Sequence, residues 1–211
     1  MSLQPFAIKR NRMVADQLAA RGIRDPKVLE VMRKVPRHLF VSPEHRTEGY
    51  DDRPIPIGWG QTISQPYIVA LMTEQLQVQP GSRILEVGTG SGYQAALLAE
   101  LGATVYSIER IPELAEGAAQ HLKAAGISTL QIRVGDGSKG WPEVAPFAGI
   151  VVAACAPHVP ELLVEQLAEN GRLVIPIGES LNQRLTVVQR LKDGLQTHEI
   201  CGCVFVPLVG E

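Results

Sequence analysis

The fold is decided by residues 83–93, which read Arg83-Ile84-Leu85-Glu86-Val87-Gly88-Thr89-Gly90-Ser91-Gly92-Tyr93. An apolar run with the pattern of a buried strand leads into three alternating glycines and then into a helix. Glycines let the backbone turn tightly and approach a ligand closely, while the start of a helix offers free amide N–H groups. The pattern therefore indicates a site for a nucleotide-like cofactor, and we expect Gly88, Thr89 and Gly90 to contact it.

Two common nucleotide-binding motifs fit these residues poorly. The dinucleotide fingerprint has its third glycine five positions after the first, where this chain has Tyr93. A P-loop needs Gly-Lys-Ser or Gly-Lys-Thr, which does not follow the turn at Gly92. Glu86 favours a cationic ligand, because a carboxylate repels phosphate and attracts the sulfonium and amino groups of S-adenosylmethionine. We expect Glu86 to lie in a site for this cofactor; alternatively, it only braces the loop.

Composition narrows the class of protein. The 211 residues are 45% hydrophobic, which is enough for one domain with a substantial core. The net charge of −2, with no long basic run, gives no indication of a nucleic-acid partner. The odd number of cysteines, three, is typical of reduced thiols in a cytoplasmic protein, and we expect neither a metal site nor a membrane span. We also expect a monomer.

Short strands alternate with helices from residue 83 onwards, which predicts a doubly wound, mostly parallel α/β sheet. A hairpin follows, with Asp193-Gly194 as its turn. The strands are expected at residues 83–87, 104–108, 131–134, 149–153 and 172–177, and the antiparallel hairpin at 185–191 and 199–206. Prolines Pro112 and Pro160 mark expected helix starts, whereas Gly102, Gly126 and Gly171 mark expected helix ends.

The first 80 residues have a different pattern. Helices are expected at residues 11–20 and, after the N-cap Asp25 and Pro26, up to Pro36. Residues 36–66 show no periodicity, which is typical of a functional loop or of disorder. This loop leads directly into a helix expected at residues 67–76.

The ends of the predicted strands carry further candidate ligands. Glu109 lies 21 residues after Gly88, close to the separation expected of an acid that accepts hydrogen bonds from ribose hydroxyls; it could instead pair with Arg110. Asp136, flanked by glycines, could reach an adenine amino group or cap a turn. The small residues 153–157 leave room for a ligand, or simply pack.

The chain resembles the protein-L-isoaspartate O-methyltransferase family. The motifs that carry the resemblance are residues 60–66 (Gly-Gln-Thr-Ile-Ser-Gln-Pro), 85–93, 135–137 (Gly-Asp-Gly) and 205–208 (Phe-Val-Pro-Leu). The glycine motif is common to many S-adenosylmethionine enzymes, whereas the Thr-Ile-Ser segment and the terminal Val-Pro-Leu are specific to this family. Ala148 departs from the pattern, because the family usually has an acid there.

The resemblance implies a class I methyltransferase fold and methyl transfer from S-adenosylmethionine to the α-carboxylate of L-isoaspartyl residues in damaged proteins and peptides. The products are the methyl ester, which collapses to a succinimide without the enzyme, and S-adenosylhomocysteine. Ser64 is implied as the catalytic hydroxyl; an N-cap for the next helix is the alternative. The implied cofactor site consists of Thr62, Ile63, Ser64, Gln65, Glu86, Gly88, Thr89, Gly90, Glu109, Arg110, Asp136 and Gly137. The implied substrate site consists of Ile57, Trp59, Ile63, Ser64, Val206 and Pro207.

We expect one domain in three parts: residues 1–80 with the substrate loop, residues 81–178 as the cofactor-binding core, and residues 179–211 as a hairpin that completes the substrate site. Three other functions stay open. The chain could methylate another carboxylate or small molecule, or a nucleic-acid base, although Ala-Pro-His after the fourth strand differs from the Asn-Pro-Pro-Tyr type of motif in base methyltransferases. It could also be a noncatalytic module that binds S-adenosylmethionine or a peptide.

Overall fold

The computed structural model of the chain describes residues 4–128, 130–180 and 182–210. The strands are β1 (Ile55–Gly58), β2 (Gln61–Ile63), β3 (Arg83–Val87), β4 (Thr104–Glu109), β5 (Leu130–Val134), β6 (Phe147–Val152), β7 (Leu167–Glu179), β8 (Asn182–Leu191) and β9 (Gly194–Cys203). The α-helices are α1 (Gln4–Arg12), α2 (Pro26–Lys34), α3 (Pro66–Leu76), α4 (Tyr93–Glu100), α5 (Pro112–Ala124) and α6 (Glu161–Glu165).

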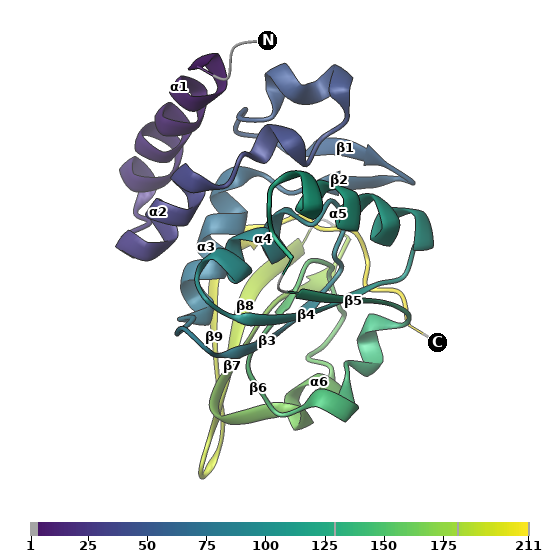
Figure 1. Cartoon of the computed structure of the whole chain (residues 1–211). Helices are drawn as coiled ribbons and strands as arrows, with labels where there is room; N and C mark the ends of the chain where they lie inside the picture. Colours follow the sequence, from purple (N-terminus) through teal and green to yellow (C-terminus); the bar gives the residue numbers. More distant parts are fainter. Residues whose placement is uncertain (1–3, 129, 181, 211) are drawn as a thin grey trace.

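Seven strands form a central sheet in the order β5-β4-β3-β6-β7-β8-β9 (Figure 1). The first five of these are parallel to one another, whereas β8 and β9 are antiparallel and form a hairpin at the edge of the sheet. The hairpin and its turn at Asp193-Gly194 were predicted, but the second strand was expected at residues 199–206 and instead begins at Gly194 and ends at Cys203. The chain leaves β3 towards β4 and β5 and later returns to the other side of β3 with β6. Strand order therefore reverses at β3, where α/β sheets bind their ligands.

Both faces of the central strands are buried, which is why their sequences read as continuous apolar runs. Ile84 and Val151 face a core shared with α2, α3 and α4. Leu85 and Ile150 face a second core shared with Leu163 of α6. The predicted doubly wound sheet is therefore confirmed, with the N-terminal helices on the same side as α3 and α4.

The N-terminal helix begins earlier than expected. The chain is helical from Gln4, and α1 continues through a π-helical stretch, Met13–Leu18, and a short 3-10 turn that ends at Gly22. The first two turns are mostly polar, so the apolar periodicity is visible only from Met13. Asp25 caps α2 as predicted, because its carboxylate accepts hydrogen bonds from the amides of Lys27 and Val28.

Residues 36–66 are mostly irregular, as predicted, but they contain the β1–β2 hairpin, which the sequence pattern does not reveal. Its strands have only four and three residues, too few for a visible alternation. Trp59 lies in the turn with a positive φ of 55° and is 61% exposed. The hairpin reaches the glycine turn, because a Cβ atom on Gly90 would lie 3.5 Å from Ile57 Cδ1.

The expected helix end at Gly171 is wrong. Helix α6 ends at Glu165, and Gly171 lies inside β7, next to an irregularity in the pairing with β6. A Cβ atom at this position would lie 2.8 Å from the carbonyl oxygen of Ala168 and 3.0 Å from that of Phe147. The glycine is thus needed for close packing of two backbones rather than for a helix end.

Within the described residues, no helix is both long and apolar enough to cross a bilayer. The same residues hold no group of three His, Cys, Asp or Glu side chains placed to bind a metal ion. The three cysteines are free thiols. Burial raises the pKa of Cys203 to about 11, so that this thiol is protonated at neutral pH.

Replacement of Gly171 by alanine should destabilise the chain by about 1–3 kcal/mol, because the added methyl group meets two backbone oxygens that cannot move aside. Gly117→Ala is the matched control. Gly117 lies inside α5 with open space around it, and alanine there should stabilise the chain by roughly 0.5–1 kcal/mol. Urea unfolding measures both. Equal stability of the two variants would contradict the steric account.

Candidate functional site

A cavity of about 1010 Å³ opens at the carboxyl ends of β3, β4 and β6. Its floor includes Val87 at the end of β3 and Gly88 after it, Ile108 and Glu109 at the end of β4, and Ala153 after β6. The position matches the reversal of strand order. The volume is at the upper end of that of ordinary ligand pockets, so that it can take a cofactor together with part of a second ligand.

The glycine turn at the base of the cavity requires the backbone conformations that glycine allows. Gly88, Gly90 and Gly92 have φ values of 91°, 53° and 87°, in the left-handed region. The amide of Gly88 donates to the carbonyl oxygen of Ile108 at 2.8 Å. The turn is therefore fixed against the neighbouring strand, and two of its glycines line the cavity.

Glu109 holds this turn in place and also lines the cavity. Its Oε2 accepts from the amide of Gly90 at 2.8 Å, and its Oε1 accepts from the amide of Ile111 at 3.0 Å. A carboxylate has about four acceptor positions, so each oxygen keeps one for a ligand. Arg110, next to it, is exposed and lines the cavity as well.

Glu86 lies behind the cavity wall in a buried chain of hydrogen bonds. Its Oε2 accepts from Ser107 Oγ at 2.5 Å, and the Ser107 hydroxyl lies 2.5 Å from that of Thr89. Its Oε1 has no hydrogen-bond partner among the described residues. Burial raises the pKa of Glu86 to about 8, and the nearby Glu109 adds to this effect, whereas the Ser107 hydrogen bond opposes it.

Asp136 serves as a turn cap in the structure. Its carboxylate accepts from the amide of Ser138 at 2.9 Å and from the Ser138 hydroxyl at 2.7 Å. The neighbouring Gly137 lines the cavity, and a Cβ atom there would lie only 2.4 Å from Val87 Cγ1. Of the two interpretations of Asp136, the structure contains the cap; a contact with a cofactor remains a prediction.

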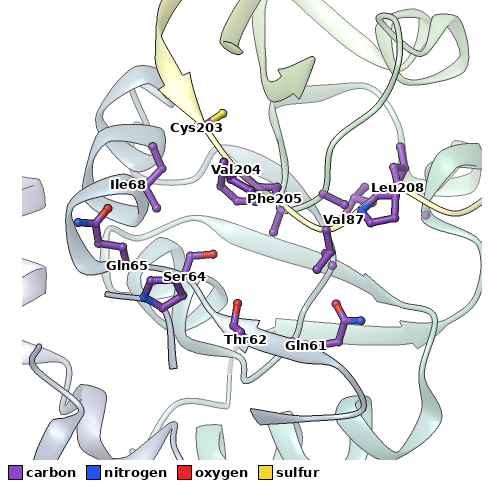
Figure 2. A pocket seen from close by; sticks show the side chains of 18 of the residues that line it. Gln61, Thr62, Ser64, Gln65, Ile68, Val87, Cys203, Val204, Phe205 and Leu208 are labelled. Carbon is purple, nitrogen blue, oxygen red and sulfur yellow. The ribbon is translucent and has the colours of Figure 1, made fainter. Parts of the chain in front are cut away.

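The loop before α3 forms one side of the cavity. Figure 2 shows Thr62 and Ser64 on this side, with the Ser64 hydroxyl pointing into the open space. The Ser64 hydroxyl caps no helix, because the N-cap of α3 is Gln65 and Pro66 begins the helix. Gln65 is anchored by its side-chain amide, which donates to Asp52 Oδ1 at 2.9 Å.

The C-terminal tail, residues 204–208, forms the opposite side (Figure 2). Two backbone hydrogen bonds fasten it to the segment after β6: the amide of Cys155 donates to the oxygen of Val206 at 2.8 Å, and the amide of Leu208 donates to the oxygen of Cys155 at 2.7 Å. The side chain of Gln183 binds the backbone of Phe205 as a neighbouring strand would: its Oε1 accepts from the Phe205 amide at 2.6 Å, and its Nε2 donates to the Phe205 oxygen at 3.1 Å.

Most of the residues expected at the site line this one cavity: Thr62, Ser64, Gln65, Gly88, Gly90, Glu109, Arg110, Gly137, Val206 and Pro207. Others lie beside it or behind its wall: Ile57, Trp59, Ile63, Glu86, Thr89 and Asp136. The Ile63 side chain is buried in the core, which leaves its backbone as the part able to face a ligand.

Sequence reasoning missed several lining residues. Arg21, which follows the N-terminal helix, reaches the cavity and pairs with Asp52 at 2.8 Å. Cys201 and Cys203 line it from β9. No local motif marks these residues, because only the tertiary fold brings them to the carboxyl ends of β3 and β4.

Comparison with known proteins agrees with this geometry. The model of the family described as protein-L-isoaspartate(D-aspartate) O-methyltransferase (PCMT) matches residues 9–211. The chain is 49% identical to the protein-L-isoaspartate O-methyltransferase of Methanoculleus marisnigri, over 100% of this chain and 96% of the relative. It is 53% identical to protein-L-isoaspartate O-methyltransferase 1 of Syntrophobacter fumaroxidans, over 98% and 96%.

The fold is shared with a solved structure of the same description. A crystal structure from Plasmodium falciparum, described as a protein-L-isoaspartate O-methyltransferase in complex with S-adenosyl-L-homocysteine, superposes with a TM-score of 0.84 at 30% identity. The match covers 95% of this chain and 98% of that one. Because the family model and these relatives span nearly the whole sequence, the chain belongs to the protein-L-isoaspartate O-methyltransferase family.

Proposed function

We propose that this enzyme binds S-adenosylmethionine on the glycine turn and that Ser64 aims the α-carboxylate of an L-isoaspartyl residue at the transferable methyl group. As a member of its family, the enzyme acts on damaged proteins that contain isoaspartyl residues and gives the methyl ester. The observation that carries the proposal is the position of Ser64, whose hydroxyl points into a cavity bounded by the glycine turn and the C-terminal tail (Figure 2).

The residues around the glycine turn fit this cofactor. Gly88 and Gly90 allow close approach of a ligand to the backbone, and Glu109 keeps acceptor positions for the ribose hydroxyls. The buried Glu86 Oε1, which lacks a partner among the described residues, fits a cationic group nearby. Arg110, Asp136 and Gly137 would lie around the adenine and ribose. When bound, S-adenosylmethionine supplies an electrophilic methyl group on a sulfonium.

The substrate would lie between the loop before α3 and the C-terminal tail. Ser64 donates its hydroxyl hydrogen to the carboxylate, and backbone amides near Ile63 and Val206 complete the binding of its oxygens. Trp59, at the exposed tip of the hairpin, and Ile57 border the path of the peptide. In this arrangement residues 179–211 complete the substrate site, with Val206 and Pro207 in the wall of the cavity.

Positioning carries the catalysis, because the nucleophile needs no general base. An α-carboxyl group has an ordinary pKa of about 3.5 and is already an anion at neutral pH. The enzyme must orient the carboxylate oxygen and remove water from it, and orientation alone can supply up to about 7–11 kcal/mol. Ser64 and the two backbone segments are the parts of the chain placed to do this.

The activity is tested with two peptides of one sequence, one carrying L-isoaspartate and the other L-aspartate. With methyl-labelled S-adenosylmethionine, we expect base-labile label on the isoaspartyl peptide alone, because only the isoaspartyl residue has a free α-carboxylate within the chain. Label on both peptides would contradict the substrate assignment. Label on neither would indicate a noncatalytic binding module.

Replacement of Ser64 by alanine should lower kcat roughly tenfold to a hundredfold, since a hydrogen bond to a charged group is worth about 1.5–3 kcal/mol. The dissociation constant of S-adenosylmethionine, measured by calorimetry, should stay within about threefold. Ser42→Ala is a matched control, because the buried Ser42 hydroxyl does not line the cavity. A loss of cofactor affinity as large as the loss of kcat would argue against the role of Ser64.

Replacement of Glu86 by glutamine should have opposite effects on stability and on cofactor binding. Because the pKa of Glu86 in the folded chain, about 8, lies above the ordinary 4.5, the free energy of unfolding of the wild type falls as the pH rises between these values. Glutamine removes that fall and should stabilise the ligand-free chain at pH 8.5 by on the order of 1–3 kcal/mol. At the same pH, affinity for S-adenosylmethionine should drop roughly tenfold.

Thermal unfolding at a series of pH values and calorimetric titration at pH 8.5 measure the two effects of Glu86→Gln. Ser107→Ala is a useful comparison, because it leaves the carboxylate in place but removes the hydrogen bond to its Oε2. An unchanged affinity in the glutamine variant would show that Glu86 only braces the loop.

A further inference from the structure

We propose that Arg37 is a positioning residue for methyl transfer: its buried guanidinium holds the backbone of Ser64, and through it the Ser64 hydroxyl, in register with the glycine turn. This inference rests on the proposed role of Ser64. Arg37 does not line the cavity and so touches neither ligand itself. It follows Pro36 at the start of the irregular segment that leads to Ser64.

The contacts of Arg37 join three segments that are distant in the sequence. Its Nε donates to the carbonyl oxygen of Gly49 at 2.7 Å, and its Nη2 donates to the carbonyl oxygen of Ser64 at 2.7 Å. Its Cζ lies 4.8 Å from the centre of the Tyr93 ring, within the range of a cation–π contact. The planar guanidinium group thus connects the middle and the end of the irregular segment to the first residue of α4.

The buried positive charge of Arg37 has a role that packing alone does not explain. Arg37 is 0% exposed and forms no ion pair with a carboxylate in the described part of the chain. Burial lowers the pKa of Arg37 to about 10, so it remains a cation at neutral pH. A buried ion costs several kcal/mol, which a Met or Leu of similar volume would avoid. Unlike these apolar side chains, the rigid, planar guanidinium donates two hydrogen bonds in fixed directions, to the oxygens of Gly49 and Ser64.

The backbone bond to Arg37 sets the direction of the Ser64 side chain. When the Ser64 carbonyl is held, the peptide plane between Ser64 and Gln65 is held too, and the position of Cβ follows from the backbone. Gln65 is fixed on the other side by its two hydrogen bonds to Asp52. Release of the carbonyl would leave the hydroxyl free to shift, and a misplacement of about 1 Å can cost roughly a hundredfold in rate.

Tyr93 links Arg37 to the glycine turn, because its ring contacts the guanidinium and its backbone begins α4. It begins α4 directly after Gly92, is 1% exposed, and donates its hydroxyl to Met32 Sδ at 3.5 Å. Burial and this hydrogen bond hold the ring in place at the start of the helix that follows the glycine turn. Through its contact with this ring, Arg37 fixes the position of the loop that holds Ser64 relative to the glycine turn. Its contacts within residues 36–66 alone could not do so.

The test compares Arg37→Lys, which keeps the charge but loses the fork, with Arg37→Met, which loses both. We expect kcat on the isoaspartyl peptide to fall roughly tenfold to a hundredfold in both, with the S-adenosylmethionine dissociation constant within about threefold. Arg172→Lys is the matched control: Arg172 is 9% exposed, and its Nε donates to the oxygen of Gln75 at 2.6 Å, at the other end of α3. This control should lose stability but keep kcat.

The decisive measurement is a double-mutant cycle with Ser64→Ala. If Arg37 acts through Ser64, Arg37→Lys should lower kcat by no more than about threefold when Ser64 is already alanine. Losses that multiply in the double variant would overturn the proposal, as would a normal kcat in Arg37→Lys beside a defective Ser64→Ala. Full activity of Ser64→Ala would overturn the proposed function first. If Arg37→Met does not fold, the milder lysine variant still decides.

Discussion

The site depends on the carboxylate of Glu109. By accepting from the amides of Gly90 and Ile111, it ties the turn after β3 to the turn after β4, so that two neighbouring strand ends form one surface. These amides come from segments that cannot pair with each other, because the ladder of the sheet has ended there. A buried acceptor between them satisfies both and leaves acceptor positions towards the cavity. The carboxylate that fixes the local structure thus also lines the cavity.

The rest of the cavity is built from segments that lie far apart in the sequence. The loop before α3 and the C-terminal tail face each other across it, and each is held by side chains that substitute for regular secondary structure (Figure 2). Arg37 donates to carbonyl oxygens on one side, and Gln183 both donates and accepts on the other. Both residues lie outside the cavity. They fix irregular backbone that has no strand or helix of its own.

Much of this architecture can be predicted from local sequence. Buried parallel strands read as apolar runs, and the glycine turn, the cap at Asp25 and the acid at the end of β4 have short-range signatures. The β1–β2 hairpin could not be predicted, because its strands are too short to show an alternating pattern. The prediction for Gly171 was wrong because glycine is favoured both at helix ends and where two backbones pack closely. The roles of Arg37 and Gln183 cannot be predicted without the fold, since their partners lie 27 and 22 residues away.

The tail at residues 204–208 has a consequence for biosynthesis. Ribosomes make proteins from the N-terminus, and of the residues that line the cavity only Val209 comes later in the sequence than this tail. The parallel core and the glycine turn are complete before the tail emerges, but the tail can be fastened to Cys155 and Gln183 only afterwards. A chain that has been made only up to residue 203 therefore lacks one wall of the cavity, although its parallel core is already complete.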